Sequence, residues 1–140
     1  NFVPDHCSIE VDRRLLPGET VDGVLAHYQS LLDSLMDEHP TLEARMEPPM
    51  LTDMALETDP GAAPAVLASR LLAEMGLDGE LCGVPFGSDA SKLSACGVDS
   101  IVIGPGSIDQ AHAAVEFVEL AEVEKAAEFY KNFALRFGVL

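Results

Sequence analysis

His112 is the histidine whose surroundings best suit a chemical role in this chain. It follows an apolar run at residues 98–103, a Gly104-Pro105-Gly106 break and a polar turn. Loops beyond the carboxyl end of a buried strand are where open α/β sheets place their ligand sites, and glycines let backbone N–H groups approach a ligand. Glu116 could orient a metal-bound imidazole if this segment were helical. A histidine hydrogen-bonded in a loop fits the same spacing, and zinc usually needs three or more protein ligands.

The remaining histidines and the three cysteines give no comparable site. His27 lies within a predicted helix and His39 lies at its end, where a surface histidine is the simpler interpretation. His6 and Cys7 are neighbours in a predicted strand, so their side chains point to opposite faces and make a poor metal pair. The cysteines show no C-x-x-C spacing, which excludes a disulfide scaffold and a zinc ribbon. We therefore expect a reducing, cytoplasmic environment.

Arg14 is the cation whose position raises a functional question. It ends a predicted strand, on the face that also carries Glu10 and Asp12. Pairing with those carboxylates would be worth little at an exposed position. Alternatively, its planar guanidinium could bind the carboxylate of a substrate, for which it is better suited than lysine.

The charge balance limits the partners that this chain can bind. The 140 residues include 24 acidic and 8 basic side chains, which gives a net charge of −16. Nucleic acid and anionic membrane surfaces would be repelled by this charge. No apolar run approaches the roughly 20 residues of a membrane span. The sequence therefore predicts no role at nucleic acid or at a membrane surface.

The first 58 residues show a strand–helix–strand pattern. Alternating side chains over residues 7–14 predict a strand, which Pro17-Gly18 ends. Thr20 is a plausible N-cap for a helix over residues 21–36, whose apolar positions recur at i, i+3, i+4 and i+7. A second alternating stretch over residues 42–46 predicts a strand, and the two prolines that follow mark an edge position or a bend.

The composition changes near Thr58, where we expect a domain boundary. Asp59-Pro60-Gly61 predicts a cap followed by proline in the first turn of an alanine-rich helix, which Gly76 ends. A brief helix is predicted to end at Gly97. Residues 81–86 and 98–103 are predicted strands, the second buried on both faces. A last helix is predicted over residues 120–137. Alternating strands and helices favour a layered α/β arrangement with an α+β first part.

Several segments together resemble a known family of enzymes. Residues 1–5 (NFVPD) and 10–19 (EVDRRLLPGE) resemble the N-V-I-P … D-x-R-x-x-P-G stretch of a co-catalytic zinc hydrolase family. That family contains acetylornithine deacetylase, succinyl-diaminopimelate desuccinylase, aminoacylase and carboxypeptidase G. Residues 87–90 (GSDA), 97–106 (GVDSIVIGPG) and 110–118 (QAHAAVEFV) are similar to its C-terminal signature. The acetylornithine deacetylase-like branch is the most similar.

This resemblance implies a particular domain organisation. Residues 1–58 would form part of a ferredoxin-like lid or dimerisation domain, contributing strand, helix and strand, and a homodimer through the lid is possible. Residues 59–140 would form the C-terminal α/β portion of the catalytic domain.

The resemblance also assigns site residues. His112 corresponds to the last zinc ligand of the family, and Arg14 to the lid arginine that holds the substrate's carboxylate. Asn1 matches a lid asparagine close to bound substrate, and the turn from Gly104 to Gly106 would line the pocket.

The implied activity is zinc-dependent hydrolysis of an N-acyl amino acid or dipeptide. The complete enzyme would hold two zinc ions, replaceable by cobalt, which activate water and the scissile carbonyl. The family's other zinc ligands and its general-base glutamate have no counterparts here, so we expect a fragment without catalytic residues that is inactive alone. Two alternatives are a non-catalytic dimerisation or binding module and an unrelated α/β domain.

Overall fold

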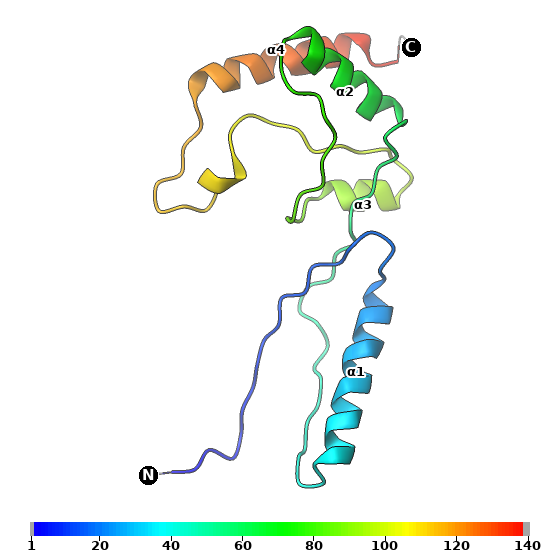
Figure 1. Ribbon diagram of the computed structural model, residues 1–140, viewed down its shortest axis with the longest axis vertical. Coiled ribbons are helices and arrows are strands. Elements are labelled where there is room, and N and C mark those ends of the chain that lie inside the picture. Colours follow the sequence, from blue (N-terminus) through cyan, green and yellow to red (C-terminus); the bar gives the residue numbers. More distant parts are fainter. Residues whose placement is uncertain (1, 139–140) are drawn as a thin grey trace. The chain divides into compact units, whose positions relative to one another are not determined.

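The computed structural model describes residues 2–138, which form four α-helices and one short 3₁₀ turn (Figure 1). These elements are α1 (Val21–Glu38), α2 (Ala63–Glu74), α3 (Ala90–Ala95), η1 (Ile108–Gln110) and α4 (Leu120–Arg136). The chain divides into two compact units. The first comprises Asn1–Ala55 and Pro85–Gly87, and the second comprises Leu56–Val84 and Ser88–Leu140. The predicted division after Thr58 into lid and catalytic domains stays a prediction.

The predicted start of α1 is confirmed in the first unit. The Thr20 side chain accepts a hydrogen bond from the Gly23 N–H at 3.1 Å, which satisfies one of the free donors at the helix start. At the other end, the His39 N–H donates to the Leu35 carbonyl at 2.9 Å, and Pro40 follows. One stripe of α1 is half-buried, although none of its residues is fully buried. The stripe comprises Val21, Val24, Leu25, Tyr28, Leu32 and Met36.

The predicted α/β fold class, including the strand–helix–strand ferredoxin-like lid, is wrong for the described residues. No strand occurs between residues 2 and 138, and residues 7–14, 42–46, 81–86 and 98–103 have no strand assignment. Alternation of side chains favours an extended backbone, but a strand also needs a ladder of hydrogen bonds to a neighbour. The four segments lack such a ladder within the described part of the chain.

The core of the second unit lies between α2 and α4. Leu67, Ala68 and Leu71 of α2 pack with Phe129 of α4, and all four are at most 3% exposed. Ala62 precedes α2, and Pro64 occupies its first turn, where a missing N–H costs nothing. The predicted cap at Asp59, with Pro60 in the first turn, is therefore wrong, since α2 begins at Ala63. Met75 caps its end, and Gly76, with φ of 69°, follows as expected.

The second predicted strand of this unit runs along the core as a single extended segment. Ile101 and Ile103 pack against the core cluster, whereas Val98 and Val102 are exposed. The prediction that this segment is buried on both faces is therefore wrong, because Val98 and Val102 lie on the face opposite Ile101 and Ile103 and are exposed. The Thr58 hydroxyl donates to the Ser100 carbonyl and ties the start of the unit to this segment.

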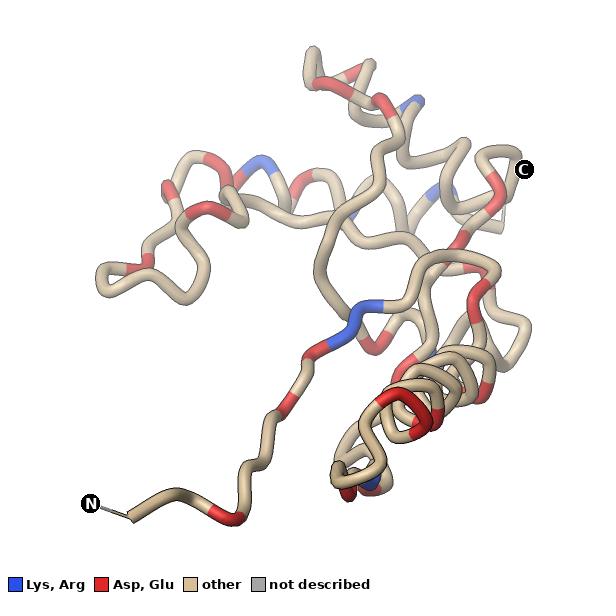
Figure 2. The backbone as a smooth tube through the Cα atoms, turned by 60° about the horizontal axis from the view of Figure 1, so that its bottom comes forward, with Lys and Arg blue, Asp and Glu red and all other residues tan. Residues whose placement is uncertain are grey.

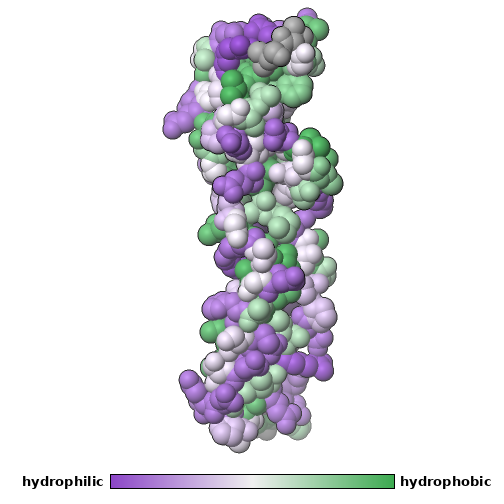
Figure 3. Space-filling view, turned by 90° about the vertical axis from the view of Figure 1, so that its right-hand side faces the viewer, coloured by the Kyte–Doolittle hydropathy of each residue, from purple (hydrophilic) through white to green (hydrophobic). Residues whose placement is uncertain are grey.

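The surface is acidic and contains many apolar side chains. Asp and Glu occur along the whole described chain, whereas Lys and Arg are few (Figure 2). In Figure 3, apolar side chains are scattered among polar ones on the face shown. Exposed apolar residues include Ile9, Leu31, Val115 and Leu135. Among the described residues, no helix has the length and hydropathy that a membrane span requires.

Candidate functional site

The turn from Gly104 to Gly106 follows the extended segment that lies on the core. Gly106 has a φ of 89°, in the left-handed region that favours glycine. A Cβ at this position would also lie 3.3 Å from Cγ2 of Val118, so a side chain would be crowded as well as strained. A Cβ at Gly104 would lie 3.6 Å from the Tyr130 hydroxyl, at ordinary contact distance. Gly106 is therefore the position where the turn requires glycine.

Helix α4 contacts both ends of this turn. The Tyr130 hydroxyl donates to the Ile103 carbonyl at 2.9 Å. The Gly106 N–H donates to Oε2 of Glu122 at 2.7 Å, and Glu122 lies in the first turn of α4. A carboxylate at a helix start is favoured by the helix dipole. The turn is thus held at two points by one helix.

His112 lies six residues beyond Gly106, in the bend that follows η1. Its side chain is exposed, and its φ of 59° is the one positive value at a non-glycine residue in the described chain. An L-residue in this conformation costs about 1 kcal/mol relative to the right-handed region. Backbone strain of this kind concentrates at functional sites. Residues 112–115 form turn and bend, and Glu116 has no assigned secondary structure, so the helical placement of Glu116 beside His112 is not found.

Arg14 lies in the first unit, in an extended segment. Its Nη2 lies 3.0 Å from Oδ2 of Asp12, and both side chains are largely exposed, at 65% and 74%. An ion pair this exposed contributes little to stability. A Cβ on Gly87 would lie 3.5 Å from Nη1 of Arg14, so the Gly87 backbone borders the guanidinium. The predicted pairing with the carboxylates of its own segment is found for Asp12.

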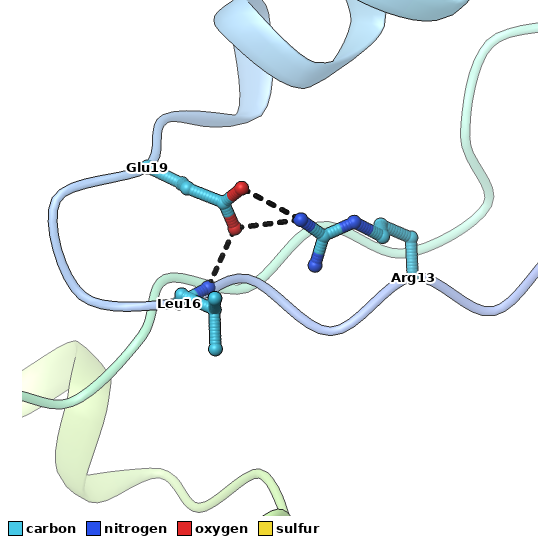
Figure 4. A network of polar contacts seen from close by, with 3 residues as sticks. All are labelled: Arg13, Leu16 and Glu19. Atoms are coloured by element: carbon cyan, nitrogen blue, oxygen red, sulfur yellow. Dashed lines mark hydrogen bonds and ion pairs between the residues drawn. The ribbon is translucent and has the colours of Figure 1, made fainter.

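The neighbouring Arg13 forms a network that sequence reasoning missed (Figure 4). Its Nη2 lies 2.6 Å and 2.9 Å from the two carboxylate oxygens of Glu19. The same carboxylate accepts the Leu16 N–H at 2.7 Å, and the Glu19 N–H donates to the Leu16 carbonyl at 3.0 Å. These bonds close the turn between Arg14 and α1. The available signal was an acidic residue six positions after an arginine, across a Pro-Gly turn.

The candidate residues are divided between the two units of the chain. Gly104, Gly106 and His112 belong to the second unit, and Arg14 belongs to the first. Asn1 lies outside the described residues. Their predicted roles remain predictions.

The residues described here do not by themselves fit a zinc site. No three His, Cys, Asp or Glu side chains between residues 2 and 138 are grouped so as to hold a metal ion. In the same residues, no buried side-chain nitrogen or oxygen lacks a hydrogen-bond partner, so no orphaned donor marks a ligand position. His112 could supply one ligand at most, and zinc sites need three or four.

Asp89 has a pKa that its surroundings lower. The Lys92 ammonium donates a hydrogen bond to its carboxylate at 2.7 Å. This hydrogen bond, followed by the positive charge of Lys92, lowers the pKa of Asp89. Asp89 is the N-cap residue of α3 and Lys92 lies within that helix, so we interpret their pair as a feature of the start of α3.

Comparison with known proteins identifies the family. The chain is 28% identical over 123 residues to acetylornithine deacetylase of Myxococcus xanthus, which covers 88% of this chain and 31% of that protein. It is 32% identical over 130 residues to N-acetyl-L-citrulline deacetylase of Xanthomonas campestris, covering 91% and 33%. A Mycobacterium tuberculosis protein provisionally named succinyl-diaminopimelate desuccinylase is 25% identical over 133 residues, covering 95% and 34%.

The chain belongs to the zinc hydrolase family of acetylornithine deacetylase and succinyl-diaminopimelate desuccinylase, and it corresponds to a C-terminal part. The resemblance predicted from its motifs is thereby confirmed. The chain spans about a third of the length of these relatives. No family model matches it, and no solved structure matches it.

Proposed function

We propose that this chain is part of an amidohydrolase that removes the acyl group from a carboxylate-bearing N-acyl amino acid. The matches to two deacetylases, over 88% and 91% of this chain, carry the proposal. Both names describe enzymes that act on an N-acetylated amino acid, which retains its free carboxylate. In the reaction, water cleaves the amide C–N bond and gives a carboxylic acid and an amine.

Each candidate residue has a role in this proposal. Arg14 binds the substrate carboxylate, because a planar guanidinium can donate two parallel hydrogen bonds to it. Its bond to exposed Asp12 is weak enough to be exchanged for a substrate. Asn1 and the Gly104–Gly106 turn line the pocket. His112 supplies one ligand of a site for two zinc or cobalt ions, to which the described residues contribute no other group of ligands.

The expected partner and compartment follow from charge and cysteine chemistry. A net charge of −16 favours a small-molecule substrate over nucleic acid or a membrane surface. The free cysteines Cys7, Cys82 and Cys96 are all exposed, as suits a reducing cytoplasm.

The test is hydrolysis of N-acetylornithine and N-acetylcitrulline by the gene product that contains this chain, purified with zinc. In that protein, His112→Ala should lower kcat/KM by about 100-fold or more. Loss of a residue that only hydrogen-bonds a metal ligand already costs about 10–100-fold, and loss of the ligand itself should cost more. Arg14→Ala should mainly raise KM, by about 10–100-fold, since a hydrogen bond to a charged group is worth about 1.5–3 kcal/mol.

Two matched substitutions control for non-specific effects. His39→Ala removes an exposed imidazole at the end of α1 and keeps the backbone cap. Arg45→Ala removes an arginine that pairs only with exposed Glu47. Neither should change kcat or KM more than about twofold, as is usual for surface positions. Equal losses in His112→Ala and His39→Ala would contradict the assignment of His112.

A non-catalytic dimerisation or binding module is the second candidate, favoured by the lack of a three-ligand metal cluster in the described residues. In this candidate, α1 provides the interface, since it has no buried residue and exposes Leu31 and Leu35. Zinc content and sedimentation of the purified gene product separate the two. Stoichiometric zinc supports the hydrolase, whereas a zinc-free dimer without activity supports the module.

A further inference from the structure

Two hydrogen bonds fasten the turn that lines the proposed pocket to α4. One joins the Tyr130 hydroxyl to the Ile103 carbonyl at 2.9 Å, just before Gly104. The other joins the Gly106 N–H to the Glu122 carboxylate at 2.7 Å. The two bonds flank the turn. Gly106 and Glu122 are 16 positions apart in the sequence, and Ile103 and Tyr130 are 27 positions apart. Local turn formation therefore does not account for them.

Both α4 side chains are themselves held in place. The Tyr130 ring packs edge-on against Phe129, with centroids 5.7 Å apart and an interplanar angle of 73°. Phe129 is 3% exposed and belongs to the core, so it fixes the direction in which the Tyr130 hydroxyl points. Glu122 lies in the first turn of α4, where the helix dipole favours its charge. A rigid element thus presents both groups.

The turn has little freedom to shift without these bonds changing. Gly106 is left-handed at φ 89°, and the space beside it is closed by Val118. A backbone N–H that donates to a carboxylate makes a charge-assisted bond, which is about twice as strong as a neutral one. The Glu122 bond therefore has the strength to select one conformation of the turn.

We propose that Glu122 and Tyr130 are positioning residues, which hold the Gly104–Gly106 turn in the shape that receives the carboxylate end of the substrate. This inference rests on the proposed function. Neither side chain touches the substrate in this proposal; each acts through the turn. Their loss should therefore weaken recognition of the carboxylate while leaving the bond-breaking step unchanged.

The first experiment tests the tether without any enzymatic activity. In the ¹⁵N-labelled 140-residue chain, Glu122→Ala should move the Gly106 amide signal and speed its exchange with water by about tenfold, as loss of about 1.4 kcal/mol would. Glu122→Gln keeps an acceptor oxygen and should restore most of the protection. Glu128→Ala, an exposed glutamate on the same helix, is the matched control. An unchanged Gly106 amide in Glu122→Ala would overturn the tether.

The second experiment measures kinetics of the complete enzyme with two substrates. One is an N-acetyl amino acid with a free carboxylate, and the other is the same compound as its carboxamide. The Glu122→Ala/Tyr130→Phe variant should raise KM for the carboxylate substrate about tenfold, with kcat changed less than about twofold. The carboxamide should be affected less than about twofold. Glu122→Gln should restore most of the loss, and Tyr28→Phe controls for removal of a tyrosine hydroxyl.

The outcomes distinguish three conclusions. A selective KM effect together with a changed Gly106 amide supports the positioning role. Equal losses for both substrates, with a lower melting temperature, mean that the residues act only in stability and overturn it. If the unsubstituted enzyme hydrolyses neither substrate, the proposed function has failed, and the positioning role fails with it. The amide measurement shows separately whether the tether exists.

Discussion

The left-handed backbone of His112 is energetically unfavourable, and among the described residues its side chain makes no contact that compensates. The residue is exposed and left-handed, at φ 59°, and no ion pair or hydrogen bond of its imidazole is found in the described chain. Glycine adopts this conformation without a steric penalty. A histidine at this position is therefore consistent with an imidazole that binds a group outside the described residues, such as the proposed metal ion.

The cost at His112 can be measured. We expect His112→Gly to raise the free energy of unfolding by about 0.5–1 kcal/mol, because relief of the left-handed strain outweighs the added entropy of the unfolded chain. His112→Ala keeps the Cβ and should change stability by less than about 0.5 kcal/mol. Urea unfolding of the 140-residue chain, followed by circular dichroism, gives both values. A less stable His112→Gly would show that the imidazole stabilises the turn.

The Asp89–Lys92 pair makes a pH-dependent prediction. The hydrogen bond and charge of Lys92 lower the pKa of Asp89, so Lys92→Ala should raise this pKa toward its ordinary value of about 4. Since the folded pKa is depressed, the stabilisation is present above about pH 4 and is lost as the pH falls through the folded pKa. Asp89 is fully exposed, so the stabilisation is small. Carboxyl ¹³C titration of Asp89 by NMR gives the pKa, and an unshifted value in Lys92→Ala would contradict the assignment.

Among the elements, α1 depends on the turn that precedes it. The Glu19 carboxylate links Arg13 to the Leu16 N–H, and Thr20 caps the helix directly afterwards. We expect Glu19→Ala to cost about 1 kcal/mol and to fray the first turn of α1, because it leaves the Leu16 N–H without this acceptor. Glu19→Gln retains an acceptor and should cost about half as much. Hydrogen exchange of the Gly23 and Val24 amides checks the fraying, and equal protection in all three proteins would contradict it.

Helix α2 is approached closely by the chain that follows it. A Cβ on Gly79 would lie 2.6 Å from the Ser69 carbonyl oxygen and 3.1 Å from Ser69 Cα, both backbone atoms of α2. The helix cannot move aside easily, because the neighbouring Leu67, Ala68 and Leu71 form the core.

We therefore expect Gly79→Ala to destabilise the chain by about 1–3 kcal/mol, as overpacking does. Gly83→Ala is the matched control, since a Cβ there meets nothing within 4 Å. Urea unfolding compares the two variants. Similar free energies of unfolding for both would mean that the loop at Gly79 can shift at no cost.

At the scale of the whole molecule, the chain covers little of its apolar surface. Five apolar residues are buried, four of them in the α2–α4 cluster, among the residues described. The extended segments with strand-like alternation contribute much of the exposed apolar area. A complete catalytic pocket is not expected from such a core.

The corresponding prediction concerns activity. The 140-residue chain alone, with zinc or cobalt added, should not hydrolyse N-acetylornithine or N-acetylcitrulline above the rate without protein, because one imidazole cannot hold the metal. Equilibrium dialysis should detect no tight stoichiometric zinc. Activity of this chain without another polypeptide would refute this expectation, and it would require ligands that the described residues do not bring together.

The sequence alone was enough to locate the longer helices and to recognise the family. The Thr20 cap, the helix stop at Pro40 and the glycine after α2 act through neighbours in sequence, as do the i→i−4 bonds that define a helix. The predicted helix over residues 120–137 agrees with α4 to within one residue at its end. The motifs around Arg14 and His112 likewise placed the chain in a family to which its relatives independently assign it.

Only the tertiary structure decided whether extended segments pair and which helix face is covered. A strand needs hydrogen bonds to a partner distant in sequence, so alternation at residues 7–14 or 98–103 could not guarantee one. The core contacts of α4 are made by Phe129 and Phe133, and the sequence pattern did not single out either residue. The bonds of Glu122 and Tyr130 to the glycine turn also join residues far apart along the chain. Such contacts depend on packing that no local pattern specifies.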